Sequence, residues 1–438
     1  MRSRLADQPH SRAVLQPGSA SAGQQRGSSG EIVVVQVVKL GIKRPATRGL
    51  LPDPEPRRVN YTLISVDDHV LEPPHAFEGR LPRDLQDKAP RVIETEEGHQ
   101  VWSFEGQPYF QVGFMCVAGR PREDMRLEPA RYDEVRSGCY LADARIKDMD
   151  LAGTWATVNF PSGVTGFGGT LFSEATDPEL GLACMRAWND WYFEEWYSAY
   201  PERVVPMGIT FPADPAKGAA EIRRNAARGF RAVTLPEQPH RLGYPAIFDS
   251  HWDPIIEACV ETGTVINLHV ASSGFAPMAP GCPPLEMGAT LFTQMAYTTA
   301  AEWLWSGHAA RHPELKIVIA EGGIGWVAGL MDRLDNIMAR SGYGQGWPDP
   351  SISPSDALRR NFWFTIIDDP STICTRHTIG VENLLFESDY PHGDGTWPDT
   401  QQVMAKMLGD LPAQEIRAIS HQNAARLYHH PLPEICLP

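Results

Sequence analysis

Short apolar runs recur along most of this chain, and each is separated from the next by a polar or amphipathic segment. Continuous apolar runs of this kind are typical of buried strands in a parallel sheet, and the segments between them have helical composition. The alternation predicts an α/β fold. Eight strands are expected, at residues 63–66, 154–159, 204–210, 231–235, 264–269, 316–320, 361–366 and 383–386. Eight strands alternating with helices favour a (β/α)8 TIM barrel.

The segments between the expected strands predict helices that cover this barrel. The clearest are residues 179–200, 215–227, 254–262 and 324–339, with a terminal helix at residues 423–428. Gly229 and Gly263 follow two of them, and a glycine at this position commonly ends a helix in the left-handed conformation. Length alone does not set the domain count, because such barrels often use 250 residues or more. We therefore expect one barrel domain over residues 59–438.

A long excursion follows the first strand. Residues 91–108 alternate between apolar and polar positions and contain a Glu97-Gly98 turn. This pattern predicts an inserted β-hairpin. The insertion is expected to occupy about residues 78–125, after which the barrel resumes.

The first 58 residues differ in composition from the rest. Residues 1–30 are rich in Ser, Gly, Gln and Arg and lack aromatic side chains, so they cannot bury enough apolar surface to offset the entropy of ordering. We expect them to be disordered, with a stray strand at residues 32–40 and a linker at residues 45–56. No stretch fits a secretory signal, and an early start codon or a dispensable extension is the preferred interpretation.

Charge and cysteine content narrow the class of protein. The net charge of −15, from 39 basic and 54 acidic residues, argues against nucleic-acid binding, which needs a basic face. It also opposes non-specific self-association and leaves a specific homodimer open. Seven cysteines without a C-x-x-C pair favour the reducing cytoplasm. The chain has no apolar run of about 18 residues, so no membrane partner is expected.

Polar residues stand at the ends of four expected strands. Asp67, Asp68 and His69 follow the first strand, His269 ends the fifth, Glu321 follows the sixth and Asp389 follows the eighth. The carboxyl ends of the strands meet at one face of a barrel, where such enzymes carry their chemistry. These side chains are therefore expected to converge.

The residue types at these ends suit a divalent metal. Asp67 and His69 are two apart on a strand and point to the same side, whereas Asp68 faces away and is interpreted as structural. With His269 and Asp389 they offer two nitrogens and two oxygens, which suits Zn²⁺ or a harder ion such as Mn²⁺ in an open site. No lysine follows the fourth strand to supply a bridging carbamate, so one ion per chain is expected; Glu237 is a weaker candidate for a second.

Each of these residues also has a structural interpretation. His269 could be a core histidine bonded to backbone, and Asp389 could cap the turn before Pro391. His392, just past the eighth strand, could serve substrate or simply lie in a solvated loop. His240 and Arg241, beyond the fourth strand, are candidate pocket residues, and Arg145 and Asp148 are expected to form structural ion pairs. Because such residues stand at the ends of four different strands, we favour the functional interpretation.

Several motifs resemble a known enzyme family. They are Ser65-Val66-Asp67-Asp68-His69-Val70-Leu71-Glu72-Pro73, the strand ending at His269, Arg311-His312-Pro313-Glu314-Leu315-Lys316, Gly322-Gly323-Ile324-Gly325-Trp326, Ser388-Asp389-Tyr390-Pro391-His392 and Asn423-Ala424-Ala425-Arg426-Leu427-Tyr428. Over residues 61–428 the chain resembles the amidohydrolase-related family that includes aminocarboxymuconate-semialdehyde decarboxylase and the resorcylate-type decarboxylases. The resemblance implies a metal-dependent hydrolase-type barrel with a small β insertion after the first strand.

The resemblance also implies roles for the candidate residues. The family's metal ligands fall on Asp67, His69, His269 and Asp389. Where the decarboxylases carry a histidine before the Gly-Gly of the sixth strand, this chain has Glu321, which brings negative charge and accepts protons. This departure bears on the reaction more than on the fold.

Two reactions follow from this ligand set. In a decarboxylation of a small aromatic or unsaturated carboxylic acid, Asp389 would deliver a proton to carbon. In the alternative, hydrolysis of an ester, lactone or amide, Asp389 or Glu321 would act as the base toward water. A non-catalytic binding scaffold is the third hypothesis, but such a protein would not be expected to keep all these groups. The family context favours the decarboxylase.

Overall fold

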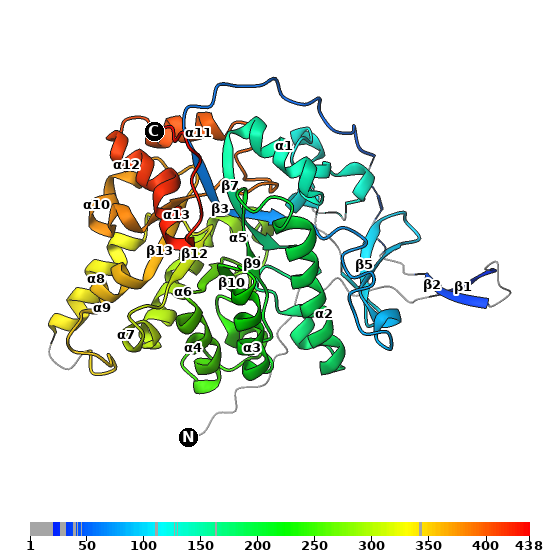
Figure 1. The fold of residues 1–438 in the computed structure, drawn as a ribbon, viewed down its shortest axis with the longest axis horizontal. Helices are drawn as coiled ribbons and strands as arrows, with labels where there is room; N and C mark the ends of the chain where they lie inside the picture. The colour runs from blue at the N-terminus through cyan, green and yellow to red at the C-terminus, as the bar shows by residue number, and fades with distance from the viewer. Residues whose placement is uncertain are drawn as a thin grey trace.

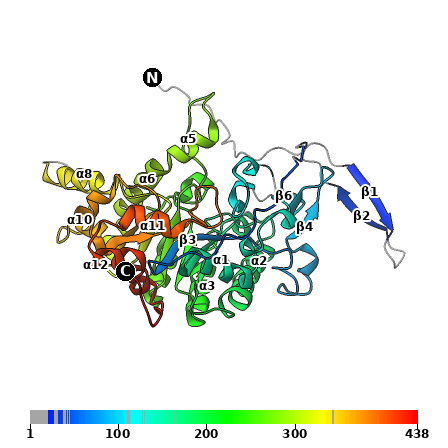
Figure 2. The same ribbon diagram turned by 90° about the horizontal axis from the view of Figure 1, so that it is seen from above.

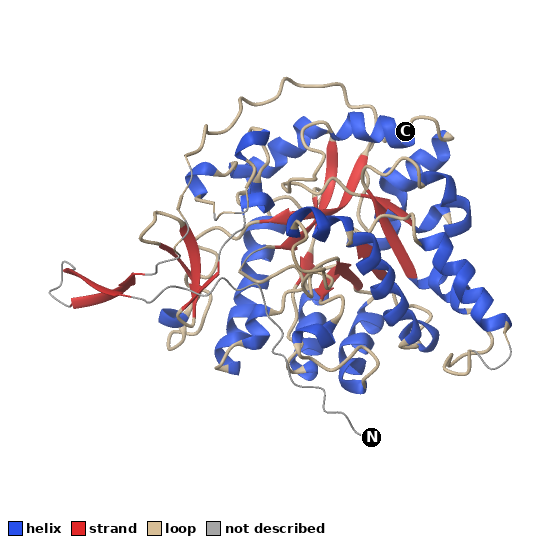
Figure 3. Cartoon of the chain, turned by 180° about the vertical axis from the view of Figure 1, so that it is seen from behind, coloured by secondary structure: helices blue, strands red, loops and turns tan. Residues whose placement is uncertain are grey.

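A ring of parallel strands forms the centre of the molecule, and helices cover its outside (Figures 1 and 3). The computed structural model describes residues 21–26, 32–37, 41, 43–44, 46–109, 113–126, 128, 130–162, 164–340 and 344–438. The ring strands are β3 (Leu63–Val70), β7 (Thr154–Pro161), β8 (Val204–Val205), β9 (Met207–Gly208), β10 (Ala232–Leu235), β11 (Val265–His269), β12 (Ile317–Ala320), β13 (Phe362–Ile366) and β14 (Leu384–Phe386). The predicted (β/α)8 fold is confirmed.

The ring is assembled from two hydrogen-bonded sheets. One has the order β3-β7-β8 and the other β14-β13-β12-β11-β10-β9. The expected third strand, residues 204–210, is divided into β8 and β9 because Pro206 between them has no N–H for a strand ladder. On the other side, the Asp389 N–H donates to the Asp67 carbonyl over 2.9 Å and so joins the chain after β14 to β3.

Helices lie between successive strands. The principal ones are α1 (Ala142–Ala152), α2 (Pro178–Trp191), α3 (Pro215–Ala227), α4 (Asp253–Thr262), α5 (Pro284–Thr290), α6 (Phe292–Trp305), α8 (Val327–Ala339), α9 (Pro354–Asn361), α11 (Thr400–Leu408) and α13 (Asn423–Tyr428). Shorter helices are α7 (His308–Arg311), α10 (Arg376–Ile379) and α12 (Ala413–Arg417). Gly263, with φ +69°, ends α4 as predicted. The expected helix at residues 179–200 ends its α-helical part at Trp191 and continues as a π-helical turn, Tyr192–Tyr197.

The insertion after β3 contains a small antiparallel sheet. Its strands are β4 (Arg91–Glu94), β5 (Gln100–Phe104) and β6 (Gln107–Tyr109), one strand more than the predicted hairpin. Gly98, with φ +82°, lies in the turn between β4 and β5. Trp102 and Phe104 of β5 are buried against Phe77 and Phe172, so the insertion packs on the barrel through aromatic contacts.

The N-terminal extension departs from expectation in two respects. Residues 21–26 form β1 (Ser21–Arg26), which pairs with β2 (Ile32–Val37), so part of the segment expected to be disordered is a hairpin (Figure 2). Residues 1–20 and 27–31 lie outside the described residues. The expected linker contacts the body of the protein: Leu51 N–H donates to the Gly119 carbonyl, and Arg57 pairs with Asp399. These contacts join residues far apart in the sequence, so composition could not reveal them.

The terminal helix α13 covers the end of the barrel opposite the carboxyl ends of the strands. Tyr428 of α13 is buried and donates a hydrogen bond to Asn267 Oδ1 within β11, at 3.1 Å. Val158, Val318 and Leu385 belong to the same apolar cluster. The barrel interior is therefore filled by side chains below the strand ends. No helix in the described part of the chain is long and apolar enough to cross a membrane.

Candidate active site

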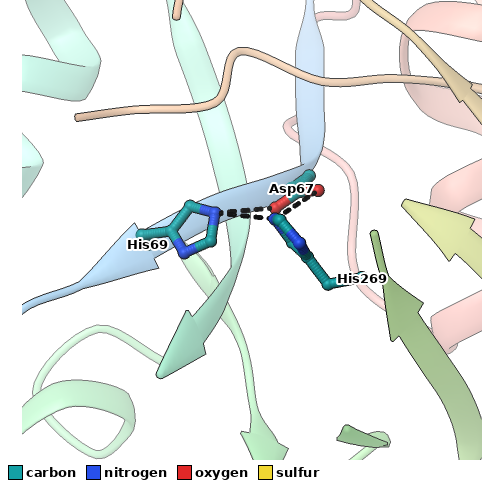
Figure 4. Close-up of side chains that lie close together, drawn as sticks. All are labelled: Asp67, His69 and His269. Atoms are coloured by element: carbon teal, nitrogen blue, oxygen red, sulfur yellow. Dashed lines mark hydrogen bonds and ion pairs between the residues drawn. The ribbon is translucent and has the colours of Figure 1, made fainter. Parts of the chain in front are cut away.

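Two strand ends bring Asp67, His69 and His269 into direct contact (Figure 4). His69 Nε2 lies 3.3 Å from Asp67 Oδ1 and 3.2 Å from His269 Nε2, and the latter lies 3.6 Å from Asp67 Oδ2. A register shift between Ser65 and Asp68, where β3 pairs with β7, marks a bulge at this point. Bulges redirect side chains beside active sites, and this one lies at Asp67. The predicted convergence of β3 and β11 is present.

Asp389 and Glu321 complete the cluster through unusual backbone conformations. Their φ angles are +51° and +56°, a left-handed region that non-glycine residues adopt rarely and at a cost. Asp389 Oδ1 lies 3.4 Å from His69 Nε2, and Glu321 Oε2 lies 3.0 Å from His269 Nε2. The Glu321 N–H is held by Thr365 Oγ1 and Glu387 Oε2. The surrounding strands thus hold both carboxylates toward the histidines.

Asp68 and Arg145 support the cluster from outside it. Asp68 accepts hydrogen bonds from the hydroxyls of Ser65, Thr157 and Ser388 and from the backbone N–H of Tyr390. Its four partners agree with the structural role predicted for it. Arg145 is buried and donates to the backbone carbonyls of His69 and Gly138, with its guanidinium over the Tyr390 ring.

Structural ion pairs were predicted for Arg145 and Asp148 of α1, and only Asp148 forms one. Asp148 pairs with Arg136 over 2.6 Å and accepts from the Tyr390 hydroxyl. Arg145 instead donates to carbonyl groups, one at the end of β3 and one in the turn before α1.

Burial determines the electrostatics of the histidines. It lowers the pKa of His269 to about 3 and of His392 to about 4, and it holds the pKa of His69 well below its usual range. The His269 Nδ1–H donates to the Val270 carbonyl at 2.6 Å, which leaves a lone pair on Nε2 toward the cluster. Neutral imidazoles with free nitrogens are the form that binds metals.

Burial acts on the carboxyl groups in the opposite direction. It raises the pKa of Asp67, Glu321 and Asp389 well above their usual ranges, and neighbouring carboxylates raise them further. Within the described residues, no Lys or Arg side chain forms an ion pair with these three groups. A cation is needed to make all three charges stable in a buried site.

The donor set fits one divalent ion. Ligand atoms each about 2.1 Å from a tetrahedral ion lie about 3.4 Å apart. The ligand atoms of Asp67, His69 and His269 lie 3.2–3.6 Å apart, and Asp389 Oδ1 lies 3.4 Å from His69 Nε2, grouped with His69 and His392. Neither carboxylate oxygen of Asp67 or of Asp389 has a hydrogen-bond partner among the described residues, although all are buried. Unpaired buried oxygens at this spacing are what a bound cation would satisfy.

Three further residues join the site: His392, a predicted substrate-side candidate, and Asp394 and Glu387, for which the sequence predicted no role. His392, predicted only as a substrate-side candidate, stacks on His69 with ring centroids 3.7 Å apart and has Nδ1 2.9 Å from Asp389 Oδ1. Asp394 is within 4.8 Å of Glu321, Asp389 and His392. Glu387 is buried, and burial raises its pKa to about 8. Their position after β14 was a usable signal, because Glu387, His392 and Asp394 lie in the same loop as Asp389.

Phe167 forms an aromatic wall on the same cluster. Its ring centroid is 4.4 Å from that of His269 and 4.7 Å from that of His69. The side chain is only partly buried, so part of it remains accessible. The sequence offered no periodic signal for this residue, because it lies in the loop after β7.

Two predicted pocket residues lie away from the cluster. His240 Nδ1 is 3.8 Å from Glu302, and Arg241 donates to the carbonyls of Gly274 and Phe275. No contact joins either residue to the four expected ligands among the described residues. Glu237 is buried and accepts from the Thr299 hydroxyl, and burial raises its pKa to about 8. His240 and Arg241 therefore lie in the loop after β10, at the rim of the barrel and apart from the cluster, whereas Glu237 is buried.

Comparison with solved structures places the fold and site in context. An amidohydrolase from Mycobacterium avium subsp. paratuberculosis K-10 is 25% identical, with TM-score 0.66, covering 85% of this chain and 100% of its own. A 5-carboxyvanillate decarboxylase from Sphingomonas paucimobilis is 20% identical, with TM-score 0.59 and the same coverages. The corresponding enzyme from Novosphingobium aromaticivorans DSM 12444, complexed with manganese and 4-hydroxy-3-methoxy-5-nitrobenzoic acid, is 19% identical, with TM-score 0.59, covering 88% and 100%.

The fold and the histidine-carboxylate cluster define a (β/α)8-barrel enzyme with its site at the carboxyl ends of the strands. A family model for amidohydrolases matches residues 172–429, more than half of the 438 residues, and the chain belongs to this family. No curated protein sequence matches it significantly.

Proposed function

We propose that this enzyme is a divalent-metal-dependent decarboxylase of a small aromatic or unsaturated carboxylic acid. The observation that supports it most is the convergence of Asp67, His69 and His269 at the strand ends, 3.2–3.6 Å apart, with Asp389 3.4 Å from His69. Structural relatives that cover nearly the whole barrel are named as decarboxylases of aromatic acids. The 5-carboxyvanillate decarboxylase from Novosphingobium aromaticivorans is complexed with manganese, so Mn²⁺ is the first ion to test beside the Zn²⁺ that the ligand types favour.

The proposed mechanism assigns the proton to Asp389. When bound, the divalent ion would supply Lewis-acid stabilisation of negative charge on the substrate. Asp67, His69, His269 and Asp389 would hold it. As the carbon–carbon bond breaks and CO₂ leaves, the bonding electrons stay on the substrate carbon. Asp389 then delivers a proton to that carbon.

The walls of the site suit a planar substrate. Phe167 presents an aromatic ring beside His69 and His269. Aromatic rings pair with an offset or an edge-to-face geometry and contribute about 0.5–1.5 kcal/mol beyond area burial. We propose that Phe167 borders the substrate ring. His392 borders the same space, whereas His240 and Arg241 remain candidates for more distant substrate contacts at the rim.

Hydrolysis of an ester, lactone or amide is the second candidate. The specific observation in its favour is Glu321, whose Oε2 is 3.0 Å from His269 Nε2 and whose pKa burial raises well above the usual range. A carboxyl group with a raised pKa is a better base near neutral pH. Either Glu321 or Asp389 could then remove a proton from water.

A paired assay decides between the two reactions. The metal-loaded enzyme is incubated with a panel of aromatic and unsaturated acids, including 5-carboxyvanillate and 2,6-dihydroxybenzoate, and CO₂ release is measured. A parallel panel contains esters, lactones and amides. Release of CO₂ from at least one acid supports the proposal. Metal-dependent cleavage in the second panel, with no CO₂ from the first, would promote hydrolysis.

The proposed location is the cytoplasm. No disulfide joins any of the seven cysteines among the described residues, and four of the seven are buried. Free thiols in this number fit a reducing compartment. The expected substrate is a small molecule.

A further inference from the structure

A second group of metal-type donors lies next to Asp67, His69, His269 and Asp389. Glu321, Asp389, His392 and Asp394 each offer one ligand atom, and these atoms all lie within 4.8 Å of one another. Glu321 follows β12, and the other three residues follow β14. Only Asp389 is also one of the four ligands that the sequence predicts. The two donor groups are therefore adjacent and share one carboxylate.

Unsatisfied buried atoms point into this second group. Both carboxylate oxygens of Asp389 and the Nε2 atom of His392 are buried and have no hydrogen-bond partner among the described residues. His392 Nδ1 lies 2.9 Å from Asp389 Oδ1, without the alignment of a hydrogen bond. Asp389 and His392 are at least nine-tenths buried. Buried polar atoms nearly always have a hydrogen-bond partner or a bound ion. The unpaired atoms of Asp389 and His392 therefore indicate that this cluster binds a further group.

The balance of charge leads to the same requirement. Asp67, Glu387 and Asp389 are fully buried, Glu321 is nearly so, and Asp394 adds a fifth carboxylate at the mouth. One divalent ion offsets two of these charges. Within the described residues, no Lys or Arg forms an ion pair with Glu321, Asp389 or Asp67. Uncompensated buried charges are costly, and a second cation would offset two more of them.

We propose that this enzyme binds a second divalent cation at Glu321, Asp389, His392 and Asp394, beside the ion held by Asp67, His69 and His269. Three carboxylates and one imidazole form an oxygen-rich set, which suits a hard ion such as Mn²⁺ better than a thiolate-preferring one. Neither carboxylate oxygen of Asp389 has a hydrogen-bond partner among the described residues, so this carboxylate can be shared between the two ions. Paired ions in enzymes typically lie ~3.5–4 Å apart, a span that one bridging carboxylate can serve.

This site gives Glu321 a role that goes beyond the proposed reaction and does not depend on it. A neutral histidine at this position would bring no charge, whereas a glutamate brings a negative one beside Asp389 and Asp394. The second ion is the partner that makes this accumulation of charge stable. Glu321 then serves as a ligand and is not a free base.

Metal stoichiometry tests the proposal without an activity assay. The full-length protein is stripped with a chelator and dialysed against saturating Mn²⁺, and bound manganese is counted by metal analysis. We expect two ions per chain. Asp394→Asn should reduce the count to one, with the affinity for the lost ion at least about 100-fold weaker, since even groups beyond the ligands contribute 10- to 100-fold. Asp410→Asn, an exposed change of the same kind, should keep two.

A spectroscopic readout separates paired ions from two unrelated ones. Two manganese ions bridged by Asp389 couple their spins, so the wild-type electron paramagnetic resonance spectrum should differ from the simple single-ion spectrum of Asp394→Asn. One ion per chain in the wild type at saturation would overturn the proposal. So would two ions in a folded Asp394→Asn protein. Failure of decarboxylation leaves these counts unchanged, so the two proposals can fail separately.

Discussion

His269 and His69 are 200 residues apart in sequence, yet their Nε2 atoms lie 3.2 Å apart at the carboxyl ends of β11 and β3. The His269 Nδ1–H donates to the Val270 carbonyl, which directs the Nε2 lone pair toward His69. Two buried imidazole nitrogens at this distance favour a shared cation between them and the adjacent carboxylate of Asp67.

The first prediction concerns this histidine pair. His269→Ala should lose the ion held with Asp67 and His69, because removing one ligand leaves too few to compete with water. Metal analysis after dialysis measures the loss. His377→Ala, an exposed histidine on α10, is the matched control and should retain the wild-type content. Wild-type metal content in His269→Ala would show that the ligand assignment is wrong.

A second prediction separates the two candidate reactions. If the enzyme is a decarboxylase, Asp389→Asn should lower kcat by about 10²–10⁴, the usual contribution of a proton-transferring group, since an amide cannot deliver the proton. Glu321→Gln should be milder. The measurement is initial-rate CO₂ release with metal content recorded for each variant. Equal losses for both variants on an ester or lactone substrate would instead favour hydrolysis.

The aromatic wall supplies a third prediction. Phe167→Ala should raise KM for aromatic acids by about 2- to 13-fold, which matches the loss of one ring contact worth about 0.5–1.5 kcal/mol. The metal count should be unchanged, because the ring contacts the histidines without supplying a ligand atom. Phe248→Ala, an exposed ring elsewhere, serves as control. An unchanged KM would place the substrate on another side of the site.

The fourth prediction concerns stability at low pH. His308 is buried, its Nε2–H donates to the Ile247 carbonyl, and burial lowers its pKa to about 4. The unfolded chain binds a proton near pH 6.5, so this histidine destabilises the folded state progressively as pH falls from about 6.5 to 4. His308→Gln keeps a donor and an acceptor but cannot titrate. Urea unfolding should show a smaller drop in unfolding free energy between pH 7 and pH 5 for the variant.

A fifth prediction revises the role of the N-terminal extension. Residues 46–57 contact the body through Leu51, through Asp53 with Arg136, and through Arg57 with Asp399. Deleting residues 1–40 should leave the melting temperature unchanged, whereas deleting residues 1–57 should lower it by about 2–4 °C, the shift for about 1 kcal/mol in a large domain. Differential scanning calorimetry compares the two. Equal melting temperatures would mean that the linker contacts contribute little.

The local pattern of the sequence contained the barrel and the ligand positions. Apolar runs closed by polar groups are short-range features, so the strands ending near Asp67, His269 and Asp389 could be located without the fold. Their convergence followed from the general geometry of parallel strands, whose carboxyl ends meet at one face. Pro206 shows the limit of this reasoning, because a continuous strand was expected where the missing N–H divides it into two.

What only the tertiary structure decided depends on backbone conformations and loop paths that no local pattern encodes. The left-handed conformations of Glu321 and Asp389 are held by neighbouring strands, and they turn both carboxylates toward the histidines. The loop after β14 brings Asp394 to Glu321, while the loop after β10 leaves His240 at the rim. Both are polar residues shortly after a strand, and the sequence could not distinguish them. The sequence by itself determined which strand ends carry metal-type groups. The folded chain decided which loop residues join them, because the path of a loop depends on hydrogen bonds to distant segments.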